Sequence, residues 1–256
     1  MSILDQFKLT GKRALVTGAN RGLGRAIAIG LAEAGADIVS ISRKPDATET
    51  EAGVRATGQS FEHVSFDLLD ATAGDLRKLV TEVTTDRPPF DILVNNAGII
   101  RRTPAATHSE ASWDSVMGVN VKASYFLSQT VATQMHANGG GKIIFTSSIL
   151  GEEGGLMVVS YTASKHAING MVKALANEWA PYNINVNAIA PGYFATDMTD
   201  ALQKDPERSR SLIERIPAGR FGKPDELKGL AVYLASDASS YVHGSIFNID
   251  GGWLAR

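Results

Sequence analysis

The stretch that decides the fold is RALVTGANRGLG, residues 13–24. An apolar run at 13–17 passes directly into a turn with glycines at 18, 22 and 24, and apolar residues then recur at helical spacing. Glycine permits a tight turn, close approach of a ligand to the backbone and close packing of helix on strand. A helix that begins here presents free N–H groups and a positive dipole end to phosphates. The stretch predicts a strand, a dinucleotide-binding turn and a helix, although glycine-rich turns without a ligand also occur.

Six further β-branched runs follow, separated by stretches of helical periodicity. They lie at residues 38–42, 63–66, 92–94, 142–146, 184–189 and 245–249. This alternation predicts βαβ units and a parallel sheet with helices on both faces. Because no linker or change of composition divides the chain, we expect residues 1–256 to form a single doubly wound α/β domain of the Rossmann type, with about seven strands. The polar stretch at about 195–222 is expected to form a lid over a ligand crevice.

Composition narrows the class of protein. The chain has 256 residues, 44% of them hydrophobic, and a net charge of −2, which suits a soluble protein with a large core. It has no cysteine, which excludes disulfides, a thiol nucleophile and cysteine-ligated metals. The nearly balanced charge argues against nucleic acid as a partner. The five histidines are scattered, so no metal site is expected.

Nothing in the sequence indicates export or a membrane. The N-terminal residues MSILDQFKLTGKR are too polar for the core of a signal peptide. No apolar run approaches the ~18 residues that cross a bilayer. We therefore expect a cytoplasmic protein without a membrane partner.

A serine, a tyrosine and a lysine form the candidate catalytic group. Tyr161 and Lys165 are four residues apart at the start of a predicted helix, so they share one face. A nearby ammonium lowers the pKa of a phenol, which is ordinarily ~10. Ser148 ends the run KIIFTSS at the carboxyl edge of the sheet, where open α/β folds bind ligands, whereas Ser147 should point to the other face. Taken singly, each also has an ordinary reading, as a helix lysine that reaches solvent or a serine in a turn.

The order of these motifs resembles the short-chain dehydrogenase/reductase family over essentially the whole chain. The landmarks that match are TGANRGLG at 17–24, NNAG at 95–98, Asn120, Ser148, Tyr161, Lys165, Pro191-Gly192 and Thr196. The resemblance implies a working enzyme, a nicotinamide cofactor that carries hydride, and a homotetramer. A non-catalytic dinucleotide sensor is the alternative from another class, but it would be natural only if Tyr161 or Lys165 were replaced.

The resemblance also implies a role for each candidate. Tyr161 would exchange a proton with the substrate oxygen, and Ser148 would hydrogen-bond the same oxygen. Lys165 would hold the nicotinamide ribose and lower the pKa of Tyr161, and Asn120 would position a water that links Lys165 to solvent. The residues implied to contact the cofactor are Gly18, Asn20, Arg21, Gly22, Leu23, Gly24, Ser42, Arg43, Asp67, Leu68, Asn95, Ala97, Gly98, Tyr161, Lys165, Pro191, Gly192 and Thr196.

The second strand bears on the choice between NAD(H) and NADP(H). An acidic residue at its end would bind the ribose diol and repel a 2′-phosphate, but position 42 is serine and Arg43 follows. Arg21 supplies a second cation inside the glycine turn, and two arginines can pair with a phosphate. The pattern favours NADP(H). NAD(H) remains an alternative, because similar chains that use it also lack an acid here.

Within the family the chain most resembles the branch that acts on sugar acids. The segments NNAGIIRR, RIPAGRFGKP and DGGWLAR resemble 2-deoxy-D-gluconate 3-dehydrogenases and 4-deoxy-5-hexosulose-uronate reductases. That resemblance implies hydride transfer at a keto or hydroxy group of a deoxy sugar acid. A gluconate 5-dehydrogenase and a 3-oxoacyl-carrier-protein reductase are the alternative enzymes.

Two adjacent arginines are candidates for recognising the substrate carboxylate. Arg101 and Arg102 follow the segment that leaves the fourth strand at the ligand edge, where Ser148 and Tyr161 should bind the substrate. The planar guanidinium can bind both carboxylate oxygens. Adjacent side chains tend to point apart, so we expect one of the two to reach the ligand and favour Arg101 slightly. A pair of solvated loop charges is the alternative.

Overall fold

The computed structural model describes residues 2–256, apart from the side chain of residue 201, and its centre is a parallel sheet of seven strands. The strands are β1 (Arg13–Thr17), β2 (Asp37–Ser42), β3 (Phe61–Ser65), β4 (Ile92–Asn95), β5 (Gly141–Thr146), β6 (Ile184–Pro191) and β7 (Ile246–Ile249). They lie in the order β3-β2-β1-β4-β5-β6-β7. The first three strands extend the sheet on one side of β1, and the chain then crosses to the other side of β1, where β4 to β7 follow in order. This confirms the predicted doubly wound Rossmann-type fold.

All the predicted β-branched runs are strands, with small differences at their ends. The third strand begins at Phe61 rather than 63, because Phe61 pairs with Ile38 of β2. The sixth extends to Pro191, which pairs with Ile249 of β7. Pairing with a neighbouring strand thus carries the ladder beyond the residues whose own β propensity is high.

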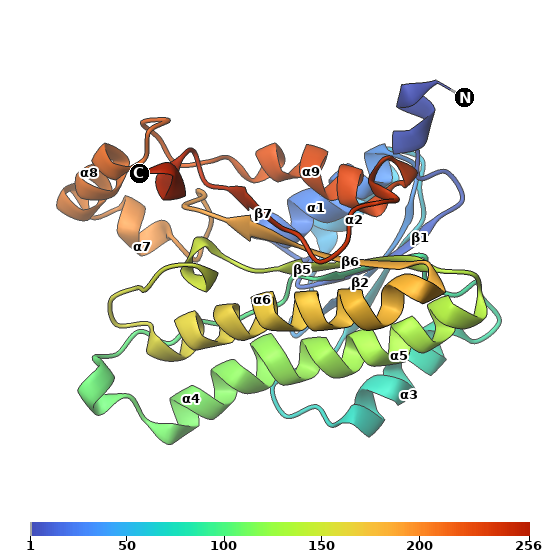
Figure 1. Ribbon diagram of the computed structural model, residues 1–256, viewed down its shortest axis with the longest axis horizontal. Helices are drawn as coiled ribbons and strands as arrows, with labels where there is room; N and C mark the ends of the chain where they lie inside the picture. Colours follow the sequence, from blue (N-terminus) through green and yellow to red (C-terminus); the bar gives the residue numbers. More distant parts are fainter. Residues whose placement is uncertain (1) are drawn as a thin grey trace.

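Helices cover both faces of the sheet, as Figure 1 shows. On one face lie α1 (Gly22–Glu33), α2 (Thr48–Arg55) and α9 (Lys228–Ala235), and on the other α3 (Ala73–Thr84), α5 (Ser124–Ala137) and α6 (Val159–Trp179). Neighbouring strand residues join opposite cores: Val16 packs with Ile27 and Leu31, whereas Leu15 packs in the other cluster with Val131. Burial on both faces explains why the strands read as continuous apolar runs. Each fully buried aliphatic side chain contributes about 1.5–3 kcal/mol to this core.

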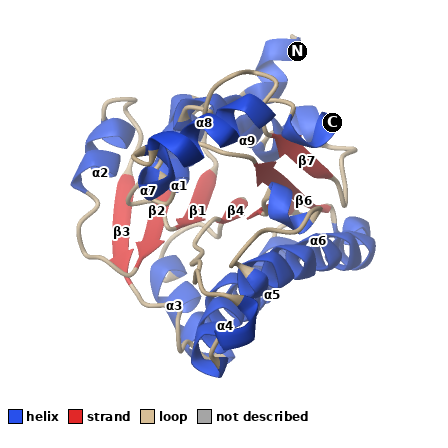
Figure 2. Cartoon of the chain, turned by 90° about the vertical axis from the view of Figure 1, so that its left-hand side faces the viewer, coloured by secondary structure: helices blue, strands red, loops and turns tan. Residues whose placement is uncertain are grey.

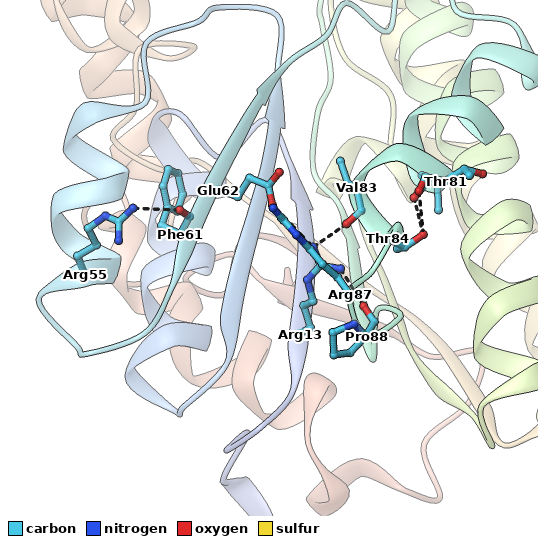
Figure 3. A network of polar contacts seen from close by, with 10 residues as sticks. Arg13, Arg55, Phe61, Glu62, Thr81, Val83, Thr84, Arg87 and Pro88 are labelled. Carbon is cyan, nitrogen blue, oxygen red and sulfur yellow. Dashed lines mark hydrogen bonds and ion pairs between the residues drawn. The ribbon is translucent and has the colours of Figure 1, made fainter.

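At the amino edge of the sheet, a buried arginine is satisfied by backbone carbonyls (Figure 3). Arg13 donates to the carbonyl oxygens of Pro88 and Val83, both at 2.8 Å, and its guanidinium lies over the Phe90 ring at 4.5 Å. Burial lowers the pKa of Arg13. The carboxylate of Glu62 lies 3.8 Å away. These contacts join the α3–β4 connection to β1, so this charge serves the fold at the edge opposite to the candidate site.

The stretch after β6 makes an excursion beyond the carboxyl edge of the sheet. It contains α7 (Asp200–Gln203) and α8 (Pro206–Arg215), and Figure 2 views it from that edge. Its two ends meet, because Ala195 donates to the carbonyl oxygen of Gly222 at 2.8 Å and Gly222 donates to that of Tyr193 at 2.9 Å. No residue of α8 is buried. Residues 195–222 therefore form a loop that is closed at its base, and the partly buried Leu212 of α8 packs against a small cluster that contains Trp253.

Candidate active site

The glycine turn has the backbone geometry that its sequence predicts. Gly18 and Gly22 have positive φ angles of 67° and 56°, which favour glycine. A Cβ on Gly24 would lie 2.3 Å from the carbonyl oxygen of Gly18, so any side chain there would force the turn and α1 apart. The Nδ2 atom of Asn96 donates to the carbonyl oxygen of Thr17 at 3.0 Å, which ties the turn to the end of β4. The turn is thus held rigidly at the carboxyl edge.

This turn fits the pyrophosphate of a dinucleotide. Arg21 is the N-cap residue of α1 and its side chain makes no capping hydrogen bond. The first N–H groups of α1 are therefore left for an anion, which the helix dipole also favours. A Cβ on Gly22 would lie 3.7 Å from the methyl group of Thr196, and Arg21 donates to Asp197 at 3.0 Å. The loop 195–222 thus contacts the glycine turn through its first residues.

Among the remaining cofactor candidates, some side chains are exposed to solvent, whereas others are buried or hydrogen-bonded within the protein. Arg43 is exposed after β2. In contrast, Asn95 donates to the Ser128 hydroxyl on α5 at 2.8 Å, and Leu68 is buried in a core cluster with Val119. Asp67 accepts from the backbone of Leu69 at 3.0 Å in a local turn. For Asn95 and Leu68, any contact with a cofactor would have to come from the backbone.

The other predicted positions belong to the same edge. The Asn20 carbonyl accepts from Arg25 at 3.0 Å, and Leu23 packs on the core cluster that contains α1. Gly18 approaches Ala97 so closely that a Cβ would lie 3.0 Å from its Cα. Pro191 ends β6, and a Cβ on Gly192 would lie 2.7 Å from the Cα of Asp250. These close approaches explain the small residues, whatever binds beside them.

The three candidate catalytic residues come from two neighbouring elements. Tyr161 and Lys165 lie on the first turns of α6, with the Lys165 Nζ atom 5.3 Å from the centroid of the Tyr161 ring. The Lys165 ammonium donates to the carbonyl oxygen of Thr146, at the end of β5, at 2.6 Å. Ser148 follows that strand and its hydroxyl accepts from the backbone of Leu150 at 3.2 Å. The prediction that Ser147 points to the other face is wrong, because its hydroxyl donates to Asn169, which also lies on α6, at 2.6 Å.

Asn120 holds two parts of the site together. It lies in a π-helical turn, Gly118–Ala123, between α4 (Glu110–Met117) and α5. Its Oδ1 accepts from the backbone of Ile99 at 2.8 Å, and its Nδ2 donates to the Ile99 carbonyl and to the Ser164 hydroxyl, both at 3.0 Å. Both ends of the amide are therefore engaged by protein. A water positioned by this residue, as the family resemblance implies, would have to be bound by its backbone.

Burial dominates the electrostatics of Tyr161 and Lys165. Burial raises the pKa of Tyr161, while hydrogen bonding with Ser148 and the charge of Arg102 lower it. Burial also lowers the pKa of Lys165 to about 7. Desolvation is the largest cause of both shifts, because burial disfavours the charged form of each group. That Lys165 lowers the pKa of Tyr161 stays a prediction.

Arg102 and Arg101 are not equivalent in the structure. The charge of Arg102 lowers the pKa of both Tyr161 and Tyr193. Both arginines are exposed, and Arg101 contributes to neither shift. This electrostatic effect makes Arg102 the stronger candidate, and the slight preference for Arg101 stays an untested prediction.

Four further residues that the sequence analysis did not identify lie together beyond the end of β6. The rings of Tyr193 and Trp253 have centroids 4.8 Å apart, and the Trp253 Nε1 donates to the Glu153 carboxylate at 2.6 Å. Arg215, at the end of α8, lies over the Trp253 ring at 4.0 Å. Burial and the charge of Glu153 raise the pKa of Tyr193, while Arg215 and Arg102 lower it. These residues are far apart in sequence, and the only available signal was the aromatic residue after Pro191-Gly192 and in the terminal DGGW.

Within residues 2–256, no three histidine, aspartate or glutamate side chains are grouped so that they could hold a metal ion. No helix in that part of the chain is long and apolar enough to span a membrane.

Comparisons with known proteins agree with this geometry. A family model described as enoyl-(acyl carrier protein) reductase matches residues 18–254. The chain is 51% identical over 256 residues to a 2-dehydro-3-deoxy-D-gluconate 5-dehydrogenase of Pseudoalteromonas atlantica, covering 99% of this chain and 100% of that protein. It is 48% identical to a candidate 2-deoxy-D-gluconate 3-dehydrogenase of Agrobacterium tumefaciens solved with bound NADP, with a TM-score of 0.92 and coverage of 98% and 99%.

A second solved structure extends the likeness. A gluconate 5-dehydrogenase of Burkholderia cenocepacia, in complex with NADP and tartrate, has a TM-score of 0.94 and 40% identity, with 100% of both chains covered. The likeness therefore includes both the glycine turn and the segment that carries Ser148, Tyr161 and Lys165. The chain belongs to the short-chain dehydrogenase/reductase family and is an NAD(P)-dependent oxidoreductase of that family.

Proposed function

We propose that the protein interconverts a ketone and a secondary alcohol on a deoxy sugar acid, of the type 2-dehydro-3-deoxy-D-gluconate, with NADP(H) as cofactor. The observation that carries the proposal is the convergence of Ser148, Tyr161 and Lys165 at the sheet edge that also holds the glycine turn. The substrate class is supported by the relative from Pseudoalteromonas atlantica, which is named for that sugar acid.

The proposed chemistry follows from the positions of these side chains. Tyr161 donates a proton to the carbonyl oxygen during reduction and takes it back during oxidation. The Ser148 hydroxyl binds the same oxygen and stabilises the charge that develops on it. Lys165, whose pKa is lowered to about 7, gains or loses its proton near neutrality and so responds to charge brought next to it. The nicotinamide, when bound, supplies or accepts the hydride.

The choice of NADP(H) rests on cations around the expected 2′-phosphate. Arg43 is exposed beyond β2, and Arg21 lies in the adjoining glycine turn. Charge-assisted bonds from arginine to phosphate are among the stronger polar contacts. The solved relatives with bound NADP support the same choice. We expect Arg43→Asp to weaken NADPH by roughly ten- to a hundred-fold and NADH much less.

The proposal also covers a substrate lid, the location in the cell and the oligomeric state. Residues 195–222 act as a substrate lid, because both ends are anchored and Thr196 contacts the glycine turn. The protein works in the cytoplasm as a homotetramer. An apolar groove of about 380 Å³ between α5 and α6, lined by residues that include Tyr125, Met171 and Trp179, supports subunit contact. Light scattering at micromolar concentration tests the tetramer.

A substrate panel tests the proposed activity. Initial rates are compared for 2-dehydro-3-deoxy-D-gluconate, D-gluconate and a 3-oxoacyl thioester, each with both cofactors and at low substrate concentration. We expect the deoxy sugar acid with the NADP couple to have the highest kcat/KM. A preference for D-gluconate would favour a gluconate 5-dehydrogenase, as the Burkholderia cenocepacia relative suggests. Cofactor binding without turnover of any of the three would favour the sensor.

A further inference from the structure

The turn at the end of β2 is held by hydrogen bonds from the neighbouring strand β3 and the residue after it. The carbonyl oxygens of residues 42, 43 and 44 each accept a hydrogen bond from β3 or the residue after it. Phe66 donates to Ser42 through its backbone at 2.9 Å, and the Ser65 hydroxyl donates to Arg43 at 3.2 Å. His63 contacts the Lys44 carbonyl through its Nε2 atom at 2.9 Å. We call residues 42–44 the cationic turn.

The hydrogen-bond partners determine the tautomer of His63. The Lys44 carbonyl can only accept, so Nε2 carries the ring proton and donates it. In the neutral ring Nδ1 is then an acceptor, and it faces the Ser40 hydroxyl of β2 at 3.2 Å. The imidazole thus bridges β2 and the turn beyond it. A second donor, the Ser42 hydroxyl, reaches the same Lys44 carbonyl at 3.0 Å.

These anchors bind the backbone and leave the charged side chains in solvent. Arg43 and Lys44 are both exposed. The turn also lies beside the glycine turn, because the backbone of Gly18 donates to the carbonyl oxygen of Ile41 at 2.7 Å. A loop fixed in this way presents its cations without the entropy cost of ordering the backbone when an anion binds.

We propose that His63 is a positioning residue that sets the preference for NADP(H) by holding the cationic turn against β3. This inference rests on the proposed function, because it requires that the 2′-phosphate bind at Arg43. His63 itself does not touch the phosphate. Its effect is confined to the phosphorylated cofactor, since NADH has no group that needs the cations of this turn.

Two substitutions that both remove the imidazole ring of His63 differ in whether they keep the hydrogen bond to the Lys44 carbonyl. In His63→Gln the side-chain amide can place a donor where Nε2 lies, so the bond to Lys44 is kept. In His63→Asn the shorter amide reaches the Ser40 side but not Lys44. His166→Asn, on the exposed side of α6, controls for the loss of an imidazole elsewhere.

The measurement is the dissociation constant of NADPH and of NADH for each purified full-length variant, read from nicotinamide fluorescence. We expect His63→Asn to weaken NADPH about two- to ten-fold, the value of one neutral hydrogen bond, and to leave NADH unchanged. His63→Gln and His166→Asn should behave as wild type. Thermal unfolding of the same variants shows whether they are folded.

The outcomes test the role of His63 separately from the proposed binding of the NADP(H) phosphate at Arg43. If Arg43→Ala lowers the preference for NADPH while His63→Asn does not, His63 has no such role and the proposed function stands. If Arg43→Ala leaves the preference unchanged, the phosphate does not bind at the cationic turn and both ideas fail there. Equal weakening of NADPH and NADH in His63→Asn would indicate a general structural role and overturn the inference.

Discussion

The ammonium of Lys165 donates a hydrogen bond of 2.6 Å to the backbone carbonyl of Thr146 and lies 3% exposed beneath the candidate site. The contact links the first turns of α6 to the end of β5, two residues before Ser148. It fixes the position of the lysine without supplying an opposite charge. A buried cation with only a carbonyl partner is destabilised relative to its neutral form, which is why the pKa of Lys165 is lowered to about 7.

This burial predicts a pH dependence of stability. Lys165 has a pKa of about 7 in the folded protein against 10.5 for the free side chain, so the unfolded chain binds more protons between these values. The free energy of unfolding of the wild type, compared with that of Lys165→Met, should therefore rise as the pH increases from about 7 to 10.5. Below pH 7 Lys165 is charged in both states, so the destabilisation caused by its buried charge reaches its full value there. The difference is on the order of a few kcal/mol. Urea unfolding of both proteins at several pH values measures it; parallel pH profiles would contradict the assignment.

Removal of the tyrosine hydroxyl should affect chemistry alone. Tyr161→Phe keeps the ring beside Lys165 but deletes the group that transfers the proton, so kcat should fall about 10²- to 10⁴-fold. The dissociation constant of NADPH, measured by fluorescence, should remain close to that of wild type. If the variant keeps more than about a tenth of wild-type turnover, another group transfers the proton.

The two arginines after the NNAG segment provide a matched pair. Arg102 lies close enough to Tyr161 to lower its pKa, so Arg102→Ala should raise the KM for an acidic sugar roughly ten- to a hundred-fold and affect a neutral analogue little. Arg101→Ala should change neither value by much. Steady-state kinetics with both substrates make the comparison. The reverse result would restore the preference for Arg101, and equal loss on both substrates would point to a change in the loop.

The hydrogen bond between Trp253 and Glu153 should couple the C-terminal segment to the turn after Ser148. Trp253→Phe keeps an aromatic ring near Tyr193 and Arg215 but removes the Nε1 donor, 2.6 Å from Glu153. A double-mutant cycle with Glu153→Ala should give a coupling energy of about 1–3 kcal/mol in the free energy of unfolding, because the acceptor is charged. Additive effects of the two substitutions would show that the contact contributes nothing.

Much of the fold could be predicted from local sequence. Strands buried on both faces need apolar side chains at every position, so β1, β4 and β5 stand out as short continuous runs. The glycine turn could also be predicted, because Gly18, Gly22 and Gly24 meet steric demands that only glycine satisfies. The positions of Ser148, Tyr161 and Lys165 followed from strand and helix periodicity, together with the family resemblance.

The sequence by itself determined the α/β class, the glycine turn and the members of the candidate catalytic group, because each depends on spacing within one element or on the step from one element to the next. Only the tertiary structure decided that the charge of Arg102 acts on Tyr161 and that Asn95 serves the core through Ser128. It alone brought Trp253 to Glu153 and His63 to Lys44. Burial likewise set the direction of the Tyr161 and Lys165 pKa shifts. These contacts and the desolvation depend on how closely side chains from different helices and strands approach one another. The spacing of residues along the chain does not reveal the distance between such side chains.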